Sequence, residues 1–273
     1  MAGGGWQRVA IGAACAGALV TLTACGGSSA ADATTPSPAA AIAMMPNANP
    51  FTSALSFTNG LGTAKATVDS TTTVDGTTTD RRVTGTIVFD PGGYGMVTVS
   101  ASGTTVQELG NTSNLFLRPD ATSLWTKRPG AARSDASWLI TPLTGLGDLA
   151  DVVDEGPVGP AGPDGAATHQ FSGTLAATPD RLRALGLTEA DIAAMGDAWS
   201  DVPITVTAWV DPRNRIVRVD RAFSATGADG KPVSARTSTT LSGFAGGLDL
   251  SDPPPQSIGA TLPSAGASSS SSS

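Results

Sequence analysis

Residues 202–210 alternate apolar and polar side chains with a period of two. The apolar side of this pattern consists of Val202, Ile204, Val206, Ala208 and Val210. The other side carries two threonines and Trp209. Because successive side chains of a β-strand point to opposite faces of the sheet, the pattern predicts a strand with one buried face.

The next segment, residues 216–225, repeats this alternation. Its apolar set is Val217, Val219 and Phe223, and Arg221 is a charged exception on the same side. The sequence Asp-Pro-Arg-Asn at residues 211–214 is a turn signal between the two segments. The two segments therefore predict an antiparallel hairpin with one apolar face.

Other parts of the chain predict further strands and a few helices. Runs rich in β-branched residues and bounded by turn signals predict strands at residues 64–74, 82–89, 94–99, 104–109, 115–117, 124–126, 168–176 and 233–243. Helices are predicted at residues 51–61, 138–154 and 178–199, the last of them broken near Gly186. A sheet with one apolar face has to be covered by such helices. The predicted fold class is α+β, with an antiparallel sheet covered on one face by helices and the core between them.

Three segments are too rich in small, polar and proline residues to fold by themselves. Residues 25–50 predict a flexible tether, and residues 253–273, which begin with three prolines and end in serines, predict a disordered tail. Residues 156–165 carry glycine at every third position. Three such triplets are too few for a collagen helix, so they predict a proline-stiffened surface loop. The folded domain is expected at residues 51–252.

The N-terminus resembles an export signal that ends in a cysteine. Arg8 precedes an apolar stretch at residues 9–22, which is shorter than the ~20 residues that cross a bilayer and fits a signal peptide. The run Leu22-Thr23-Ala24-Cys25 has the pattern of a bacterial lipobox, with small residues before the cysteine. Residues 1–24 are predicted to be a cleaved lipoprotein signal peptide, and the Cys25 thiol to carry a diacylglyceryl group. An ordinary secretory signal and a single N-terminal anchor helix stay open as alternatives.

Cleavage before Cys25 changes the cysteine count and the charge. Cys15 is lost, so the mature chain holds one cysteine and no disulfide, and its core and sheet must stabilise it. Loss of Arg8 changes the formal charge of −7 by one, to −8. An acidic chain without clustered Lys and Arg argues against nucleic acid and anionic phospholipid as electrostatic partners. We expect a monomer that is held by its acyl chains at the extracytoplasmic face of the cell membrane.

The sequence offers little for catalysis. It has no G-x-S-x-G motif, and no lysine follows a serine by three positions. His169 is the only histidine, and a structural role in a strand is expected for it. One histidine and one acylated cysteine cannot make a zinc site. No catalytic residue, metal site or cofactor is predicted.

The carboxylates Asp148, Asp151, Asp154 and Glu155 recur at near-helical spacing. They lack the residue spacing and the glycine of a calcium-binding EF-hand loop. The sequence therefore predicts that they form the solvated face of a helix.

Four of the tryptophans, namely Trp125, Trp138, Trp199 and Trp209, are candidates for the core, because large aromatic side chains dominate burial. Trp209 lies opposite the apolar face of its strand. It packs under a second layer or stands exposed as a contact surface.

Three stretches resemble a known family: residues 115–127 (LFLRPDATSLWTK), 165–175 (GAATHQFSGTL) and 202–219 (VPITVTAWVDPRNRIVRV). They are similar to a strand pair ending in tryptophan, a strand before a long helix and the closing hairpin of actinobacterial LppX/LprG-type lipoproteins. These proteins share a curved half-barrel with the LolA and LolB lipoprotein carriers. The resemblance implies a LolA-like half-barrel with an apolar cavity between sheet and helices that holds an acylated lipid or glycolipid. The implied ligand-binding residues are Ile204, Val206, Ala208, Val217, Val219 and Phe223.

These observations predict a membrane-anchored extracytoplasmic lipoprotein that binds or carries a lipid or acylated ligand, each buried methylene contributing about 0.8 kcal/mol. The alternative is a non-enzymatic lipoprotein with a filled core that binds an envelope protein partner. A hydrolase that uses His169 is a third hypothesis.

Overall fold

Residues 50–89, 95–101, 103–111, 113–129, 139 and 141–261 are described by the structure, a computed structural model. The chain divides into two compact units, Met1–Thr35 and Pro36–Ser273, and every described residue belongs to the second. This second unit carries its own hydrophobic core, so it can fold without the first. Cys25, most of the predicted tether, residues 90–94 and Trp138 lie outside the described residues.

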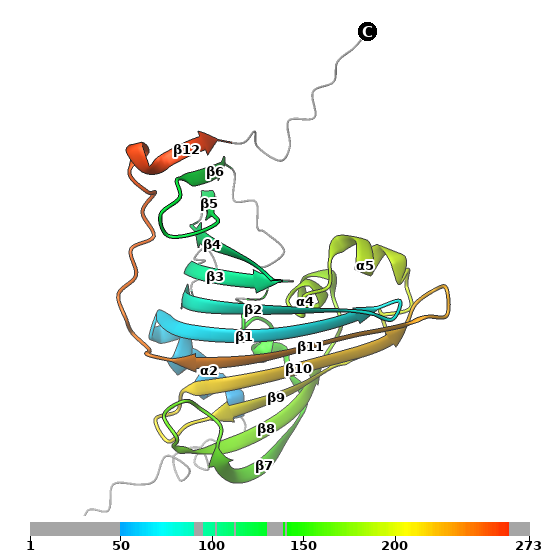
Figure 1. The fold of residues 1–273 in the computed structure, drawn as a ribbon. Helices are drawn as coiled ribbons and strands as arrows, with labels where there is room; N and C mark the ends of the chain where they lie inside the picture. The colour runs from blue at the N-terminus through cyan, green and yellow to red at the C-terminus, as the bar shows by residue number, and fades with distance from the viewer. Residues whose placement is uncertain are drawn as a thin grey trace, which may run out of the picture. The chain divides into compact units, whose positions relative to one another are not determined.

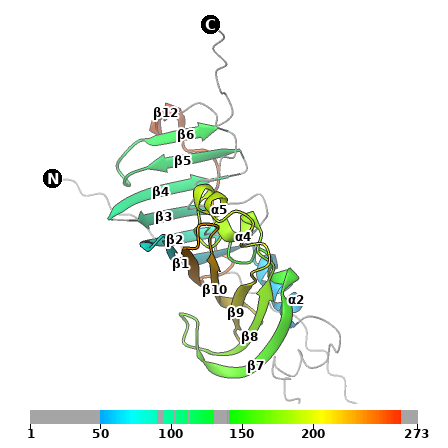
Figure 2. The ribbon, with the colours of Figure 1, turned by 90° about the vertical axis from the view of Figure 1, so that its right-hand side faces the viewer.

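All the strands among the described residues belong to one sheet (Figure 1). Its twelve strands follow the order β12-β6-β5-β4-β3-β2-β1-β11-β10-β9-β8-β7. Their bounds are β1 (Thr63–Val74), β2 (Thr77–Val88), β3 (Gly95–Ala101), β4 (Thr104–Gly110), β5 (Asn114–Arg118), β6 (Trp125–Pro129), β7 (Ala150–Pro160), β8 (Ala167–Leu175), β9 (Ile204–Val210), β10 (Ile216–Thr226), β11 (Pro232–Ser242) and β12 (Ile258–Thr261). All neighbours pair antiparallel except β12, which pairs in parallel with β6. The sheet is curved, as Figure 2 shows, and within the described residues it is not closed.

A row of directly paired residues marks the buried face of this sheet. The row consists of Val83, Val68, Thr239, Val219, Ala208 and Phe171, from β2, β1, β11, β10, β9 and β8 in turn. All six side chains are buried. We call the face that carries this row the inner face.

Short helical elements cover the inner face. They are α2 (Pro50–Gly60), the 3-10 helix η1 (Leu146–Asp148), α4 (Pro179–Arg183) and α5 (Glu189–Ala194), and their buried side chains share one cluster with the row (Figure 2). The predicted class is confirmed: an α+β fold with a curved antiparallel sheet covered on one face by helices.

The predicted break near Gly186 separates α4 from α5. Thr178 caps α4 by accepting a hydrogen bond from the Arg181 backbone N–H, and Thr188 caps α5 in a reciprocal capping box with Asp191. Gly186 has a φ of 95°, and a Cβ there would lie 2.5 Å from Ser70 Oγ. The glycine thus allows the chain to turn against β1 between the two helices.

The predicted helix at residues 138–154 is wrong. Among the described residues of this range, only Leu139 and η1 are helical, and β7 begins at Ala150. The predicted loop at residues 156–165 is wrong over its first half, because β7 extends to Pro160. β7 is an edge strand whose register to β8 shifts at three places, and Asp151 and Gly156 have positive φ angles. An edge strand with bulges accommodates prolines and irregular spacing, which hid its period-two pattern.

The predicted disorder of residues 253–273 is also wrong in its first part. Pro255–Ser257 form the 3-10 helix η2, and β12 follows it and pairs with β6. The three prolines therefore interrupt the chain between two strands, since a final strand follows them. Residues 262–273 lie outside the described residues.

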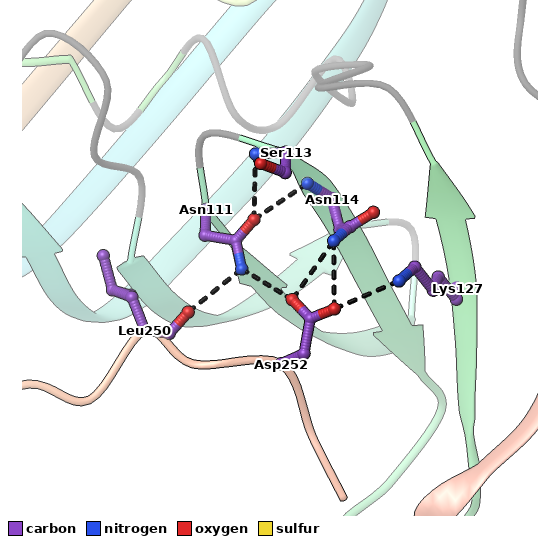
Figure 3. Close-up of polar contacts among 6 residues, drawn as sticks. All are labelled: Asn111, Ser113, Asn114, Lys127, Leu250 and Asp252. Carbon is purple, nitrogen blue, oxygen red and sulfur yellow. Dashed lines mark hydrogen bonds and ion pairs between the residues drawn. The ribbon is translucent and has the colours of Figure 1, made fainter. Parts of the chain in front are cut away.

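Residues 243–257 connect β11 to β12 past the strands between them (Figure 1). The carboxylate of Asp252 anchors this connection by accepting hydrogen bonds from the Nδ2 groups of Asn111 at 2.9 Å and Asn114 at 3.0 Å (Figure 3). Lys127 Nζ lies 3.0 Å from the same carboxylate. These contacts hold the connection against β4, β5 and β6.

A second hydrophobic cluster lies beneath this connection. It consists of Leu109, Phe116 and Trp125, with Leu250 and Ile258 packed against it. The cluster is separate from that of the inner face, so it provides matched control positions for experiments on the inner face.

Candidate functional site

The residues predicted to bind a ligand are all buried, with none more than 3% exposed. Five of them share the cluster of the inner face: Ile204, Val206, Ala208, Val219 and Phe223. Their strands are held by the ladders of β9 with β8 and β10. The predicted alternation therefore places these five side chains together.

Val217 departs from the predicted alternation. The register of β10 against β9 shifts between Ile216 and Arg218, and Ile216 joins the cluster of the inner face in place of Val217. Gly162 covers Val217, because a Cβ at Gly162 would lie 3.1 Å from the Val217 Cβ. A bulge of one residue moved this side chain, and the sequence pattern did not reveal it.

Residues 141–149, which we call the cover segment, fill the space next to the five clustered residues. Its three leucines, Leu143, Leu146 and Leu149, are buried in the same cluster. Asp148 holds the segment to α4 through an ion pair of 2.5 Å with Arg181. The cover segment thus fills part of the core between the sheet and the helices with its own leucines.

Arg221 lies on the inner face between apolar neighbours and contacts the cover segment. It is directly opposite Val206 and Thr237 in the register, and only 6% of it is exposed. Its Nη2 donates to the carbonyl oxygens of Pro142 at 2.6 Å and Thr144 at 2.8 Å. Burial, with a smaller contribution from the nearby charge of Arg181, lowers the pKa of Arg221 to about 10.

The hydrogen bonds of Arg221 are incomplete. Its Nε is buried and has no hydrogen-bond partner, and no carboxylate of the described residues forms an ion pair with it. Buried polar groups are nearly always paired, so this cation is the most unusual group on the inner face. The sequence showed Arg221 only as an exception in an apolar stripe. The predicted position of Arg221 on the apolar face was correct. Its hydrogen-bond partners could not be predicted in the same way, because Thr144 lies 77 residues away along the chain.

Buried hydroxyl groups lie beside Arg221 on the same face. Thr237 is directly opposite Arg221, and it pairs in turn with Ser70. Thr239 is opposite Val219. All three hydroxyl residues are at most 4% exposed, so the inner face carries a polar patch within its apolar surface.

His169 lies on β8 near the open edge of the sheet. Its Nε2 is 2.8 Å from Asp154 Oδ1, and its ring packs 4.9 Å from the ring of Phe171. No hydroxyl group in the described part of the chain hydrogen-bonds to it. This arrangement offers an oriented imidazole without a nucleophile, and the hydrolase hypothesis gains no support from it.

The four carboxylates predicted for a helix face have separate positions, because that helix does not form. Asp148 pairs with Arg181, and Asp154 pairs with His169. Glu155 accepts a hydrogen bond of 2.6 Å from Ser172. Within the described ranges, no three His, Cys, Asp or Glu side chains are grouped as ligands of a metal ion.

The tryptophans divide between core and surface. Trp125 is buried in the second cluster, and Trp199 packs at the margin of the first. Trp209 is half-buried beneath the guanidinium of Arg218, whose Cζ lies 4.8 Å from the ring centroid. Trp209 therefore packs beneath an arginine, which was neither of the two predicted arrangements.

A hollow of about 390 Å³ lies elsewhere, where β1, β2 and β3 meet. Its lining includes Asp69 and Arg82, whose ion pair of 3.2 Å is largely exposed. Charged and hydroxyl groups line this hollow, and it does not include any of the predicted ligand-binding residues.

No helix among the described residues combines the length and the apolar character needed to cross a membrane.

No model of a protein family and no curated protein matches this sequence. Among solved structures, the chain is similar to LprF from Mycobacterium bovis, with 14% identity and a TM-score of 0.45 over 74% of this chain and 94% of that chain. It is also similar to a DUF1329 family protein from Desulfovibrio piger, with 11% identity and a TM-score of 0.27 over 72% of this chain and 92% of that chain. A LolA superfamily protein from Nitrosomonas europaea has 11% identity and a TM-score of 0.21, over 75% and 95% of the two chains. These TM-scores are low, so the fold class rests on the sheet of this chain itself.

Proposed function

We propose that this protein is a lipoprotein of the cell envelope that binds an acylated ligand between the inner face of its sheet and the cover segment. Cys25 is the proposed site of acylation, and the lipobox motif around it supports an anchor at the extracytoplasmic face of the membrane. The ligand-binding residues in this proposal are the five clustered side chains from β9 and β10.

The observation that carries this proposal is the nature of the cover segment. The sheet is held by continuous ladders, whereas the only regular structure in residues 141–149 is the three-residue helix η1. Moving the segment away exposes the part of the inner face that it covers, without breaking a strand pair. Acyl chains then replace Leu143, Leu146 and Leu149, at about 0.8 kcal/mol for each methylene that becomes buried.

The filled core favours a second candidate function, a lipoprotein that binds an envelope protein and no lipid. In that case the leucines of the cover segment are a permanent part of the core. The two candidates differ in whether the folded protein takes up lipid, and this is measurable.

The test uses residues 36–273, the unit that holds the whole described core. The purified protein is stripped of lipid, incubated with vesicles of phosphatidylethanolamine and phosphatidylglycerol, separated from them, and examined by native mass spectrometry. The expected result is a folded protein with bound lipid. A folded protein that takes up no lipid would leave the partner-binding function as the better conclusion.

A pair of matched variants locates the ligand. Val206→Trp fills the inner face, and Phe116→Trp enlarges a side chain in the second cluster. Both should destabilise the protein by about 1–3 kcal/mol through overpacking. Only Val206→Trp should also lose the lipid, and retention of lipid by this variant would show that the inner face is not the binding surface.

A further inference from the structure

Arg221 carries a positive charge into the core, and the fold gives it an incomplete set of partners. A guanidinium group has five N–H donors in a planar fork. The two acceptors in contact with it are the carbonyl oxygens of Pro142 and Thr144, and both bind the same nitrogen, Nη2. Nε stays unpaired. The two carbonyls are neutral, and no carboxylate among the described residues forms an ion pair with Arg221.

The acceptors of Arg221 belong to the part of the molecule that the proposed function moves. Both carbonyls lie in the cover segment, so opening the segment removes them and leaves the guanidinium facing the ligand space. Arg221 sits on the ladder of β10 with β9 and β11, which stays in place. The open state would therefore present a buried cation with free donors, among the side chains proposed to contact the acyl chain.

The neighbouring charges do not supply the missing counter-ion. Arg181 is the nearby cation, and it is already paired with Asp148 at 2.5 Å. Gly145 of the cover segment packs against the Arg181 guanidinium, since a Cβ at Gly145 would lie 2.9 Å from Arg181 Nε. Within the described part of the chain, Arg181 thus has a paired carboxylate and Arg221 does not.

We propose that Arg221 receives an anionic group of the acylated ligand, a carboxylate or a phosphate, and that the Pro142 and Thr144 carbonyls occupy its place while the cover segment is closed. This inference rests on the proposed function and names the chemical class of its ligand.

Three features of the site fit such an anion. The guanidinium fork matches a carboxylate or phosphate in bidentate geometry, and it would then use Nε together with Nη2. The hydroxyl of Thr237, on the residue directly opposite Arg221, is a further donor for a polar head group. Val206 lies opposite Arg221, and Val219 lies two residues before it on β10. Both are apolar and would contact the acyl chain of the ligand. One amphiphilic ligand therefore satisfies both kinds of surface.

The experiment compares two ligands that have the same hydrocarbon chain but a charged or a neutral head group. Oleate and oleyl alcohol have the same chain, and each is titrated against residues 36–273 by displacement of the neutral dye Nile red. The wild-type protein should bind oleate at least about tenfold more tightly, the size of effect expected for one charge-assisted contact. Equal affinity for the two ligands would overturn the inference and leave the proposed function standing. No binding of either ligand would contradict the proposed function itself.

Arg221→Met should bring the ratio of the affinities for oleate and oleyl alcohol close to one. The ratio is the quantity compared, because loss of the hydrogen bonds to Pro142 and Thr144 changes the opening of the cover segment equally for both ligands. The control is Arg218→Met, which removes the same charge from the outer side of the same strand, where Arg218 pairs with Asp220 at 2.7 Å. It should keep the preference. An equal loss in both variants would indicate long-range electrostatics and refute direct contact.

Arg221→Lys provides a second measurement of the preference for oleate, which stays informative if the methionine variant does not fold. Lysine keeps the charge but cannot make the bidentate contact. It should keep a preference for oleate that is smaller than that of the wild type by about threefold or more. The affinity for a phosphate-bearing probe, lysophosphatidate, should change among the variants in the same way as the affinity for oleate. If the affinity for lysophosphatidate is the same in all variants of residue 221, the inference is overturned for phosphates.

Discussion

Replacement of Leu146 by alanine tests whether the cover segment is a movable part of the core. Leu146 is fully buried in η1, within the cluster of the inner face. Substitutions of this kind cost about 2–5 kcal/mol through lost burial and the cavity left behind. For a domain of this size, each kcal/mol lowers the Tm by about 2–4 °C, so a loss of ~3 kcal/mol corresponds to roughly 6–12 °C.

The same substitution has a second consequence if the segment opens to bind a ligand. The lost contacts belong to the closed state, so the open fraction rises. Since ~1.4 kcal/mol is a factor of ten, a loss of ~3 kcal/mol raises the open fraction by about a hundredfold, until opening is complete. The apparent affinity for a ligand that requires the open state rises by the same factor. Leu146→Ala should therefore be less stable and bind oleate more tightly.

The assay combines thermal unfolding with the oleate titration, using Leu109→Ala as the control. Leu109 is buried in the second cluster, so its truncation should lower the Tm comparably. It should not change the affinity for oleate, because it does not touch the cover segment. If Leu146→Ala binds oleate no more tightly than Leu109→Ala does, the cover segment is a fixed part of the core and the reasoning is refuted.

Three further predictions address other parts of the chain. Cys25→Ala should abolish acylation, measured by mass spectrometry of the membrane fraction, and lipid-modified protein from this variant would contradict the predicted lipobox. His169→Gln should lower the Tm by only a few degrees and leave lipid binding unchanged, because the imidazole contacts Asp154 and no nucleophile. The side-chain amide of Asn111, assisted by Lys127, lowers the pKa of Asp252, so its stabilising contribution is present above the unfolded pKa of about 3.9 and is lost as the pH falls through the lower folded value. Unfolding measured between about pH 5 and pH 2 should show this loss in the wild type, and Asp252→Asn should remove that part of the pH dependence.

Local patterns predicted the strands that lie within the sheet. The alternation of residues 202–210 correctly placed Ile204, Val206 and Ala208 on the buried face, because each strand there has neighbours on both sides. The pattern failed at the two edges. β7 has register shifts and two prolines, and the four-residue strand β12 exists only because residues 243–257 bring it beside β6. The prediction that Val217 lies on the inner face was wrong for a similar reason, since one bulge displaced this side chain from the cluster of the inner face.

For the candidate site, the sequence by itself placed five of the six predicted side chains on the inner face and showed that Arg221 is charged among them. It also supports the prediction of a lipobox around Cys25, because that motif is read from the sequence without any tertiary contact. Only the tertiary structure decided what covers the inner face and what Arg221 binds. The leucines of the cover segment recur at every third position and favoured a helix, and the carbonyls of this segment meet Arg221 across more than 70 residues of chain. Such contacts depend on the closure of long loops by the whole sheet, so no local pattern of side chains records them.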